Sequence, residues 1–455
     1  MSEFGPGVNI HIVGVGGAGM SGLALLLSEM GCVVSGSDVT ASPVLDSLKA
    51  AGVQVDVGHD GSHGSGAQVV LWSPAVREDN VELIAARERG ATLLSRAQVL
   101  KRLSSMQPVI GLTGTHGKTT ATSMMVHVLR AGGRDDSRLL GAPVNSVGAN
   151  GHWGSGSLVL EVDESYGTFA LLAPFALGLL NVEVDHLDHY GTLQNLEEAF
   201  ARLLVRTTGP VVAWGDDEGA RRVSDASGRE VILVGAAPQF VWRVDDVSLS
   251  RRGCTFTLVG PHERLDLALR VTGLHNVANA AVVAVLARSL GVDGPAVIDG
   301  LAAFEGAPRR FQFLGRWRGV DVYEDYAHLP GEIAATLAAT KSIGYERITA
   351  VFQPHRVTRT INLAPQFAAA FGDATTVVVT DIYRAGEDNP TGVTGEIIAN
   401  HIRLSGPDAS CAYGATFSDV VEILEVAHDR SDVILLLGAG DIADVAGQLS
   451  GGLQS

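Results

Sequence analysis

Residues 108–129 read PVIGLTGTHGKTTATSMMVHVL, and this stretch is the strongest local signal in the chain. An apolar run comes first, then the loop Gly114-Thr115-His116-Gly117-Lys118-Thr119-Thr120, then a run with helical spacing. Backbone N–H groups of such a loop, together with the N-terminus of the helix that follows, bind phosphate oxygens. The order therefore predicts a phosphate-binding loop between a buried strand and a helix.

The loop departs from the strict GxxxxGK[ST] pattern, because Leu112 stands where the first glycine belongs. In that pattern the lysine, here Lys118, reaches the β- and γ-phosphates, and the hydroxyl of Thr119 binds Mg²⁺. The alternative is a chance Gly/Thr turn before a helix. The buried-type strand directly before GKTT favours the phosphate loop.

Outward from this stretch, short Val/Ile/Leu runs alternate with longer amphipathic segments, which is typical of α/β folds with parallel sheets. A length of 455 residues allows about three domains of ~150 residues. We place them at 1–107, 108–307 and 308–455. We expect Rossmann-like outer domains and a central P-loop ATPase-type domain with a mixed sheet, β-rich over residues 231–269.

A second glycine-rich loop follows the first strand. Gly14-Val-Gly16-Gly17-Ala-Gly19 satisfies G-x-G-x-x-G, and Asp38 ends the next strand. This is the dinucleotide fingerprint, and such a loop holds the diphosphate of NAD or of a UDP-sugar. An NAD-linked oxidoreductase is one interpretation, but it leaves the loop at 114–119 without a role.

Carboxylates and histidines follow the phosphate loop. Glu161 ends the run SLVLEV, where it is placed to bind Mg²⁺ directly or through water, and a solvated strand end is the alternative. The cluster Asp185-His186-Leu187-Asp188-His189 has spacing that suits a metal or a helix N-terminus. It lacks the fuller ligand set of a zinc hydrolase.

Basic residues gather at strand ends in the last third of the chain. Arg309-Arg310 precedes one apolar strand, residues 325–328 end another, and His355-Arg356 with Arg359 end a third. Guanidinium groups bind carboxylate or phosphate in a fork, although each arginine alone also suits an acidic protein's surface.

Residues 273–279, GLHNVAN, begin a helix in which His275 and Asn279 are four apart and share a face. An imidazole and an amide on one face suit an adenine ring. From sequence alone, helix capping and core packing are the favoured explanation of the pair.

The bulk composition excludes several classes of protein. A net charge of −17 argues against nucleic acid or an anionic membrane as a partner. Cys32, Cys254 and Cys411 are too scattered for a disulfide framework or a thiolate zinc site. The N-terminus lacks a secretory pattern, and the apolar stretch 169–184 is too short to span a bilayer. We expect a soluble cytoplasmic enzyme.

Taken together, the motifs resemble the Mur ligase family over essentially the whole chain. They are GVGGAGMSGLA, GTHGKTT, EVDES, NVEVDHLDHYG, GLHNVANA, RRFQ, DYAH, FQPHRVTRT, DIYRAGED and LLGAGDI, in that order. The glycine-rich N-terminus is similar to that of the alanine-adding and tripeptide-adding members. The resemblance implies an ATP- and Mg²⁺-dependent ligase of peptidoglycan precursor synthesis, with UDP-N-acetylmuramate and L-alanine as its small-molecule substrates.

The resemblance also implies roles for individual residues. The catalytic set would be Lys118, Glu161, His186, Arg310 and His328. ATP would contact residues 114–120 together with His275, Asn279, Arg310 and Asp325, and Mg²⁺ would bind Thr119, Glu161 and His186. The UDP moiety would contact Gly14, Gly16, Gly17, Gly19, Met20, Ser21, Asp38 and Ser73, and the amino acid would contact His355, Arg356 and Arg359.

Three positions depart from the family's pattern. Leu329 stands where a second histidine is common, Val357 replaces a common tyrosine, and Tyr166 follows EVDES where aspartate is usual. These positions leave the amine open, so a ligase that attaches a recycled tripeptide is the main alternative. A nucleotide-dependent binding protein without ligase chemistry is another.

Overall fold

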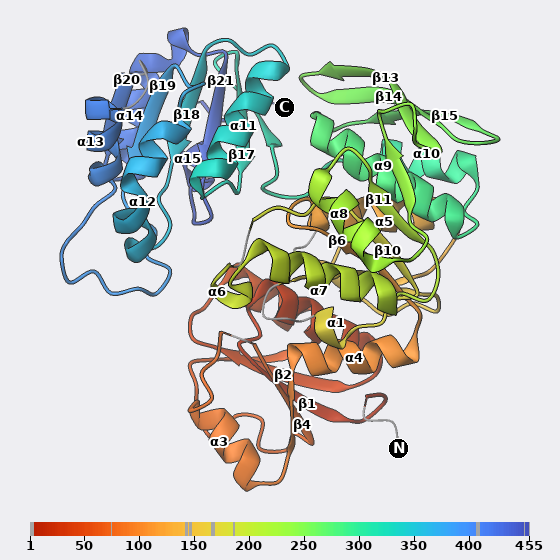
Figure 1. The fold of residues 1–455 in the computed structure, drawn as a ribbon. Helices are drawn as coiled ribbons and strands as arrows, with labels where there is room; N and C mark the ends of the chain where they lie inside the picture. Colours follow the sequence, from red (N-terminus) through yellow and green to blue (C-terminus); the bar gives the residue numbers. More distant parts are fainter. Residues whose placement is uncertain are drawn as a thin grey trace. The chain divides into compact units, whose positions relative to one another are not determined.

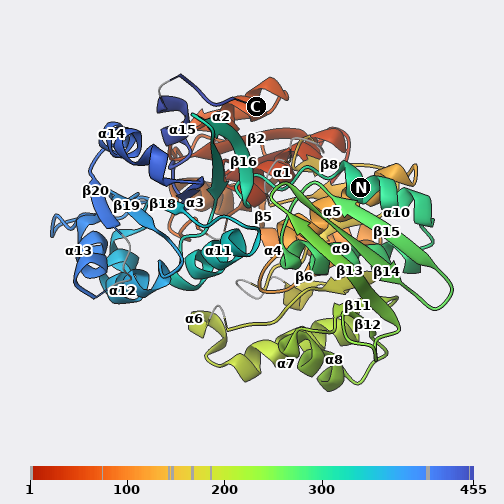
Figure 2. The same cartoon turned by 90° about the horizontal axis from the view of Figure 1, so that it is seen from above.

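The computed structural model describes residues 4–73, 75–141, 144, 148–164, 169–184, 187–405, 410–449 and 451–454. The chain divides into two compact units, Met1–Glu305 and Gly306–Ser455 (Figures 1 and 2). Three sheets form within them, which confirms the α/β class with three sheet-containing domains. The boundary at 107 stays a prediction, since the first two sheets share one unit. Within the described residues, no helix has the length and apolarity needed to cross a membrane.

The first sheet is Rossmann-like, as predicted. Its strands run in the order β3-β2-β1-β4-β5, and every neighbouring pair is parallel. The central strand, β1, is buried after its first residue, as expected of a strand covered on both faces, and its one buried polar side chain is His11. The elements are β1 (Asn9–Val13), α1 (Ala18–Glu29), β2 (Val33–Asp38), α2 (Pro43–Ala50), β3 (Gln54–Val57), β4 (Val69–Trp72), α3 (Val81–Glu88), β5 (Thr92–Ser95) and α4 (Arg96–Met106).

The second sheet is mixed, in the order β15-β14-β13-β12-β11-β10-β6-β9-β7-β8. Its parallel core places β6 between β9 and β10. It comprises β6 (Val109–Thr113), β7 (Ser137–Leu139), β8 (Gly151–His152), β9 (Leu158–Glu161), β10 (Ala176–Leu179), β11 (Val211–Trp214), β12 (Ile232–Gly235), β13 (Trp242–Ser250), β14 (Gly253–Val259) and β15 (Arg264–Leu269).

The helices of this second part are α5 (Lys118–Ala131), α6 (Leu187–Tyr190), α7 (Leu193–Arg206), α8 (Glu218–Ser227), α9 (Leu274–Ser289) and α10 (Gly294–Ala303). Helix α5 is buried from Thr120 to Leu129 without a break, because it packs against both α9 and α10. Its buried residues include the polar Thr122 and Ser123, whose hydroxyl groups donate to the backbone oxygens of Lys118 and Thr119 at 2.8 Å.

The first two sheets share one hydrophobic core. Leu23 of α1 and Leu139 of β7 belong to the same buried cluster. Asn150 Nδ2 donates to Ser21 Oγ at 3.1 Å, and Trp153 N donates to Glu29 Oε2 at 2.8 Å. These contacts join α1 to the second sheet and explain why both sheets fall in one unit.

The third sheet, in the second unit, runs in the order β16-β17-β21-β18-β19-β20. Of the pairs between these strands in the described residues, β16–β17 is antiparallel and the others are parallel. The elements are β16 (Gln312–Trp317), β17 (Val320–Asp325), α11 (Pro330–Ser342), β18 (Ile348–Phe352), α12 (Val357–Ala370), β19 (Thr376–Thr380), α13 (Glu396–Ser405), β20 (Ser410–Gly414), α14 (Phe417–Ala427), β21 (Val433–Leu437) and α15 (Asp444–Gln448). Ligands bind beyond the carboxyl ends of strands in such sheets.

Candidate functional site

The phosphate loop joins β6 to α5, as predicted. Gly117 is the N-cap of α5 with φ +84°, and a Cβ there would lie 2.7 Å from Asn279 Oδ1. Gly114 has φ +143°, and its Cβ would lie 2.9 Å from the backbone oxygen of Asn181. Only glycine suits both the conformation and the space at these positions. The loop backbone therefore packs closely against Asn181 and Asn279.

Asn181 holds the tip of this loop, and sequence reasoning missed it. Its backbone oxygen accepts from Thr115 N at 3.1 Å, and its Oδ1 accepts from His116 N at 2.8 Å. Its Nδ2 donates back to His116 O at 3.1 Å. Asn181 lies just beyond β10, the parallel neighbour of β6, so a polar residue after that apolar run was the available signal.

Lys118 is anchored inside the loop by a second residue that the sequence did not reveal. Its Nζ donates to Gly114 O at 2.7 Å, to Thr115 O at 3.0 Å and to both carboxylate oxygens of Glu164 at 2.9 Å. Glu164 is buried, and burial raises the pKa of its carboxyl group against the opposing effect of Lys118. The ammonium group is thus held where the loop would place a phosphate.

Thr119 and Glu161 come together as predicted. Thr119 Oγ1 donates to Glu161 Oε2 at 3.2 Å, and Gly141 N donates to Glu161 Oε1 at 2.6 Å. Burial raises the pKa of Glu161. A hydroxyl beside a carboxylate is an oxygen pair of the kind that Mg²⁺ prefers. His186 lies outside the described residues, within which no cluster of three or more His, Cys, Asp or Glu side chains could hold a metal ion.

Helix α9 brings one predicted nucleotide contact to the loop. Asn279 is buried, and its amide abuts Gly117. His275 lies one turn earlier and is exposed. A contact of either residue with adenine stays a prediction.

The N-terminal glycine loop gathers its predicted residues at the end of β1. Gly16 N donates to Asp38 Oδ2 at 2.8 Å, and a Cβ on Gly16 would lie 2.8 Å from the same oxygen. Gly14 has φ +78°, and its Cβ would lie 3.0 Å from Ser73 Cβ. Gly17 is the N-cap of α1, and its backbone oxygen accepts from the N–H groups of Met20 and Ser21.

Arg96 also lies at this loop, although sequence reasoning did not select it. A Cβ on Gly19 would lie 2.8 Å from Arg96 Nε. That nitrogen is buried and has no hydrogen-bond partner among the described residues. A guanidinium group beside a helix N-terminus favours an anion. The available signal was a basic residue directly after the strand 92–95.

The two arginines before β16 have different roles. Arg309 has φ +60° and turns into the unit, where Nε donates to Glu324 at 2.7 Å and Nη2 donates to Gly438 O at 2.7 Å and Gly440 O at 2.8 Å. The expectation that both arginines form a ligand fork is therefore wrong for Arg309. Arg310 is exposed, and its guanidinium carbon lies 5.2 Å from the centre of the Tyr326 ring.

Asp325 ends β17 with both carboxylate oxygens engaged. Oδ2 accepts from Phe311 N at 2.7 Å and Oδ1 accepts from Ala327 N at 2.8 Å. Burial raises the pKa of this carboxyl group. Asp325 thus fixes the backbone on either side of Tyr326, and the ribose contact stays a prediction.

The predicted amino-acid residues converge at the ends of β17, β18 and β19. The rings of His328 and His355 meet edge to face with centroids 5.8 Å apart, and Tyr383 stacks on His355 at 5.5 Å. Arg359 Nη1 lies 3.5 Å from His355 Nδ1. Arg356, with φ +73°, is the N-cap of α12. Sequence reasoning missed Tyr383 although it quoted the motif DIYRAGED.

The positions that depart from the family pattern have different surroundings. Val357 is buried at the first residue of α12. Leu329 is the N-cap of α11, and its backbone N–H donates to Glu332 Oε2 at 3.0 Å. Tyr166 lies outside the described residues.

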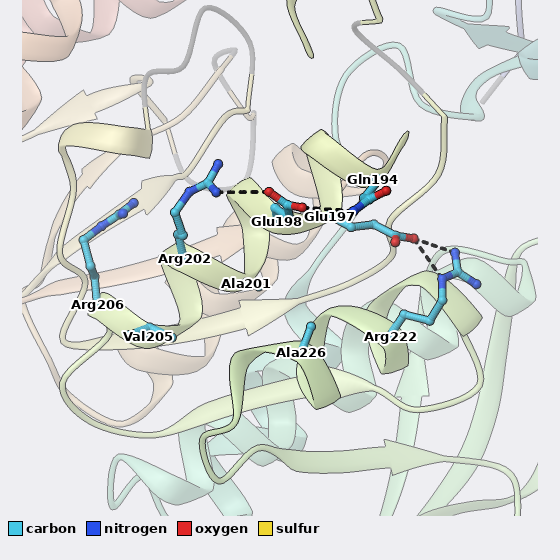
Figure 3. A pocket seen from close by; sticks show the side chains of 9 residues that line it. All are labelled: Gln194, Glu197, Glu198, Ala201, Arg202, Val205, Arg206, Arg222 and Ala226. Atoms are coloured by element: carbon cyan, nitrogen blue, oxygen red, sulfur yellow. Dashed lines mark hydrogen bonds and ion pairs between the residues drawn. The ribbon is translucent and has the colours of Figure 1, made fainter. Parts of the chain in front are cut away.

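An open groove of about 590 Å³ lies between α7 and α8 and contains none of the predicted site residues (Figure 3). Both of its carboxylates are paired with arginines. Arg222 lies 2.7 Å from Glu197, and Arg202 lies 3.5 Å from Glu198. The third arginine, Arg206, donates to the backbone oxygens of Leu172 and Phe169.

Family models match all three parts of the chain: the Mur ligase family catalytic domain at residues 9–107, the Mur ligase middle domain at 112–287, and the Mur ligase glutamate ligase domain at 309–440. The chain belongs to the Mur ligase family, which confirms the resemblance inferred from its motifs.

Curated relatives make the similarity more specific. UDP-N-acetylmuramate–L-alanine ligase of Gloeobacter violaceus is 40% identical over 445 residues, covering 96% of this chain and 95% of that protein. The ligase of the same name from Saccharopolyspora erythraea is 40% identical, and the match covers 95% of this chain and 91% of that protein.

Solved structures agree with this assignment. The crystal structure of UDP-N-acetylmuramate-alanine ligase MurC from Thermotoga maritima has a TM-score of 0.82 at 30% identity, covering 97% of each chain. A murein peptide ligase from Psychrobacter arcticus is 24% identical, and the match covers 97% of this chain and 98% of that chain. Its TM-score of 0.69 shows that it shares the fold.

Proposed function

We propose that this chain joins the lactyl carboxylate of UDP-N-acetylmuramate to the amino group of L-alanine, with hydrolysis of ATP to ADP and phosphate, in peptidoglycan precursor synthesis. The observation that carries the proposal is the 40% identity, over nearly the whole chain, to ligases of that name. We place the UDP substrate on residues 1–107, ATP on 108–307, and the amino acid on 308–455.

The phosphate loop fits a nucleoside triphosphate. Gly117 is the N-cap of α5, so the N-terminus of this helix would present its backbone N–H groups to the phosphates. When ATP binds, Lys118 would give up part of its hydrogen bonding to Glu164 and donate to the β- and γ-phosphates instead. We further assign His275 and Asn279, with Arg310 and Asp325, to ATP.

Thr119 and Glu161 present the oxygens for Mg²⁺. A bound Mg²⁺ would neutralise phosphate charge and hold the γ-phosphoryl group in line. Lys118 adds a fixed positive charge beside it. We keep His186 as a further proposed ligand.

The activation step needs an electrophile, because a carboxylate resists attack by an amine. In the proposed reaction the substrate carboxylate attacks the γ-phosphorus of ATP, giving an acyl-phosphate and ADP. The loop contributes position and charge, which are the main contributions of a protein to phosphoryl transfer. The amine then attacks the acyl carbon and phosphate leaves.

The N-terminal loop fits the UDP diphosphate. The N-terminus of α1 favours an anion, and Arg96 adds a guanidinium group whose Nε is buried against Gly19. Ser73 and Asp38 lie at the same loop. An NAD interpretation of this loop has no support from the relatives' names.

A cytoplasmic location fits small soluble substrates of this kind, and a net charge of −17 gives no attraction to nucleic acid or anionic membranes. The tripeptide-adding activity is the second candidate. Leu329 and Val357 favour keeping it, because both lie beside His328 or Arg356 in the sequence.

The test is phosphate release from ATP and Mg²⁺ with UDP-N-acetylmuramate and a panel of amines that includes L-alanine and the wall tripeptide. We expect release that needs both the UDP-sugar and L-alanine. Release only with the tripeptide would move the assignment to the second candidate. ATP binding without amine-dependent release would overturn the ligase assignment in favour of a nucleotide-binding protein.

A further inference from the structure

All the donors of the Lys118 ammonium group have acceptors in the structure. Its Nζ lies 2.7 Å from Gly114 O, 3.0 Å from Thr115 O and 2.9 Å from each carboxylate oxygen of Glu164. An ammonium group has three N–H donors, and here it faces four acceptors. Lys118 can therefore donate to a phosphate only by releasing an acceptor that it contacts.

Glu164 is the acceptor that a phosphate resembles. The other two are backbone carbonyls of the phosphate loop, which is fixed because Thr115 N donates to Asn181 O at 3.1 Å and His116 N donates to Asn181 Oδ1 at 2.8 Å. The carboxylate of Glu164 is an anion and makes a charge-assisted contact through both oxygens. Its side chain is 1% exposed and that of Lys118 is 16% exposed, so salt and water screen the pair little.

The backbone around Glu164 is anchored at two points. Tyr190 Oη donates to Glu164 O at 2.6 Å, and Thr113 Oγ1, at the end of β6, donates to Val162 O at 2.7 Å. These bonds involve backbone oxygens, so they do not depend on the carboxylate. The carboxylate therefore stays beside the loop when Lys118 turns to another anion, and it can accept from the ammonium group again.

We propose that Glu164 competes with the phosphates of the nucleotide for Lys118 and thereby promotes the release of ADP. Binding of ATP separates a buried carboxylate from its ammonium partner, which weakens the affinity. Once the γ-phosphoryl group has left ATP, Lys118 loses one of its phosphate contacts and returns to Glu164. Glu164 is thus a positioning residue that acts through Lys118. The inference rests on the proposed function, because it assumes ATP at this loop.

The test is nucleotide binding to the full-length protein in the presence of Mg²⁺, measured by titration calorimetry with ADP and with a non-hydrolysable ATP analogue. Glu164→Gln keeps the shape of the side chain and removes its charge. We expect both Kd values to fall about tenfold, because a neutral amide holds Lys118 less tightly than a carboxylate does. The dissociation rate of a fluorescent ADP analogue should fall by a similar factor.

The sign of the change separates this role from a structural one. Damage to the loop would raise the Kd values, so values that are unchanged or higher in folded Glu164→Gln would overturn the proposal. If circular dichroism shows that Glu164→Gln does not fold, Glu164→Asp takes its place. Its shorter side chain draws the carboxylate away from Lys118, so both Kd values should again fall, and unchanged values would overturn the proposal.

Glu183→Gln is the matched control, because it removes one carboxylate charge on the His116 side of the same loop. Glu183 is exposed, and its Oε2 lies 3.6 Å from His116 Nε2. We expect this variant to change either Kd by less than about twofold, since exposed ion pairs contribute little. A fall equal to that in Glu164→Gln would overturn the specific role of Glu164. A wild-type protein that binds neither nucleotide contradicts the proposed function instead.

Discussion

A buried carboxylate in the first sheet gives a sharp stability prediction. Glu82, on α3, is 1% exposed and accepts from His11 Nε2 at 2.7 Å, Ser37 Oγ at 2.8 Å and His59 Nδ1 at 2.7 Å. His63 Nδ1 lies 3.3 Å away. Although burial opposes ionisation, these hydrogen bonds lower the pKa of Glu82 to about 2.

The lowered pKa of Glu82 determines how the stability of the fold changes with pH. The unfolded carboxyl group titrates near 4.5, so the ionised group stabilises the fold above that pH and the stabilisation is lost as pH falls from about 4.5 to about 2. The difference between a pKa of 4.5 and one of about 2 corresponds to about 3 kcal/mol. Glu82→Gln should therefore lower the opening free energy of the first sheet by about 3 kcal/mol at pH 7.

Native-state hydrogen exchange of the amides in β1 and β2 measures the free energy of the opening that exposes these strands. Glu88→Gln, at the exposed end of the same helix, is the matched control and should change little. Equal exchange in Glu82→Gln and the wild type at pH 7 would refute the reasoning. So would a difference that persists unchanged at pH 3.

Three further predictions concern the two loops. Gly117→Ala should raise the KM for ATP at least tenfold. A φ of +84° costs a non-glycine residue about 1–2 kcal/mol, and the added methyl group would meet Asn279. The folded content measured by circular dichroism should be unchanged. Asn181→Ala should raise the KM for ATP more than that for UDP-N-acetylmuramate, since His116 loses both hydrogen bonds; equal effects on both would contradict this. Arg96→Ala should weaken UDP binding about 10- to 100-fold in titration calorimetry and leave ATP binding alone, as expected for a charge-assisted contact.

The parts of the site that follow from local sequence were predictable. An apolar run, a glycine-rich loop and a run with helical spacing are all local signals, so the loop at Gly114–Lys118 and the one at Gly14–Gly19 lie between a strand and a helix as expected. Strand ends in a parallel sheet meet at one edge, which is why His328 and His355 come together.

The missed residues depend on tertiary register instead. Glu164 and Asn181 reach the phosphate loop only because β9 and β10 flank β6 in the sheet, and the order of strands is not written in any local pattern. Arg96 follows β5 and Gly19 lies shortly after β1, and the two meet because only β4 separates these strands in the first sheet. Arg309 differs from Arg310 through a positive φ that no adjacent glycine announces.

Direct detection of the product tests the central claim most directly. Mass spectrometry of a reaction containing the full-length protein, ATP, Mg²⁺, UDP-N-acetylmuramate and L-alanine should show the UDP-sugar with one added alanyl residue, with ADP and phosphate formed in equal amounts. Lys118→Ala should form none while keeping its fold. Unchanged UDP-N-acetylmuramate in the presence of active, ATP-binding wild-type protein would contradict the account.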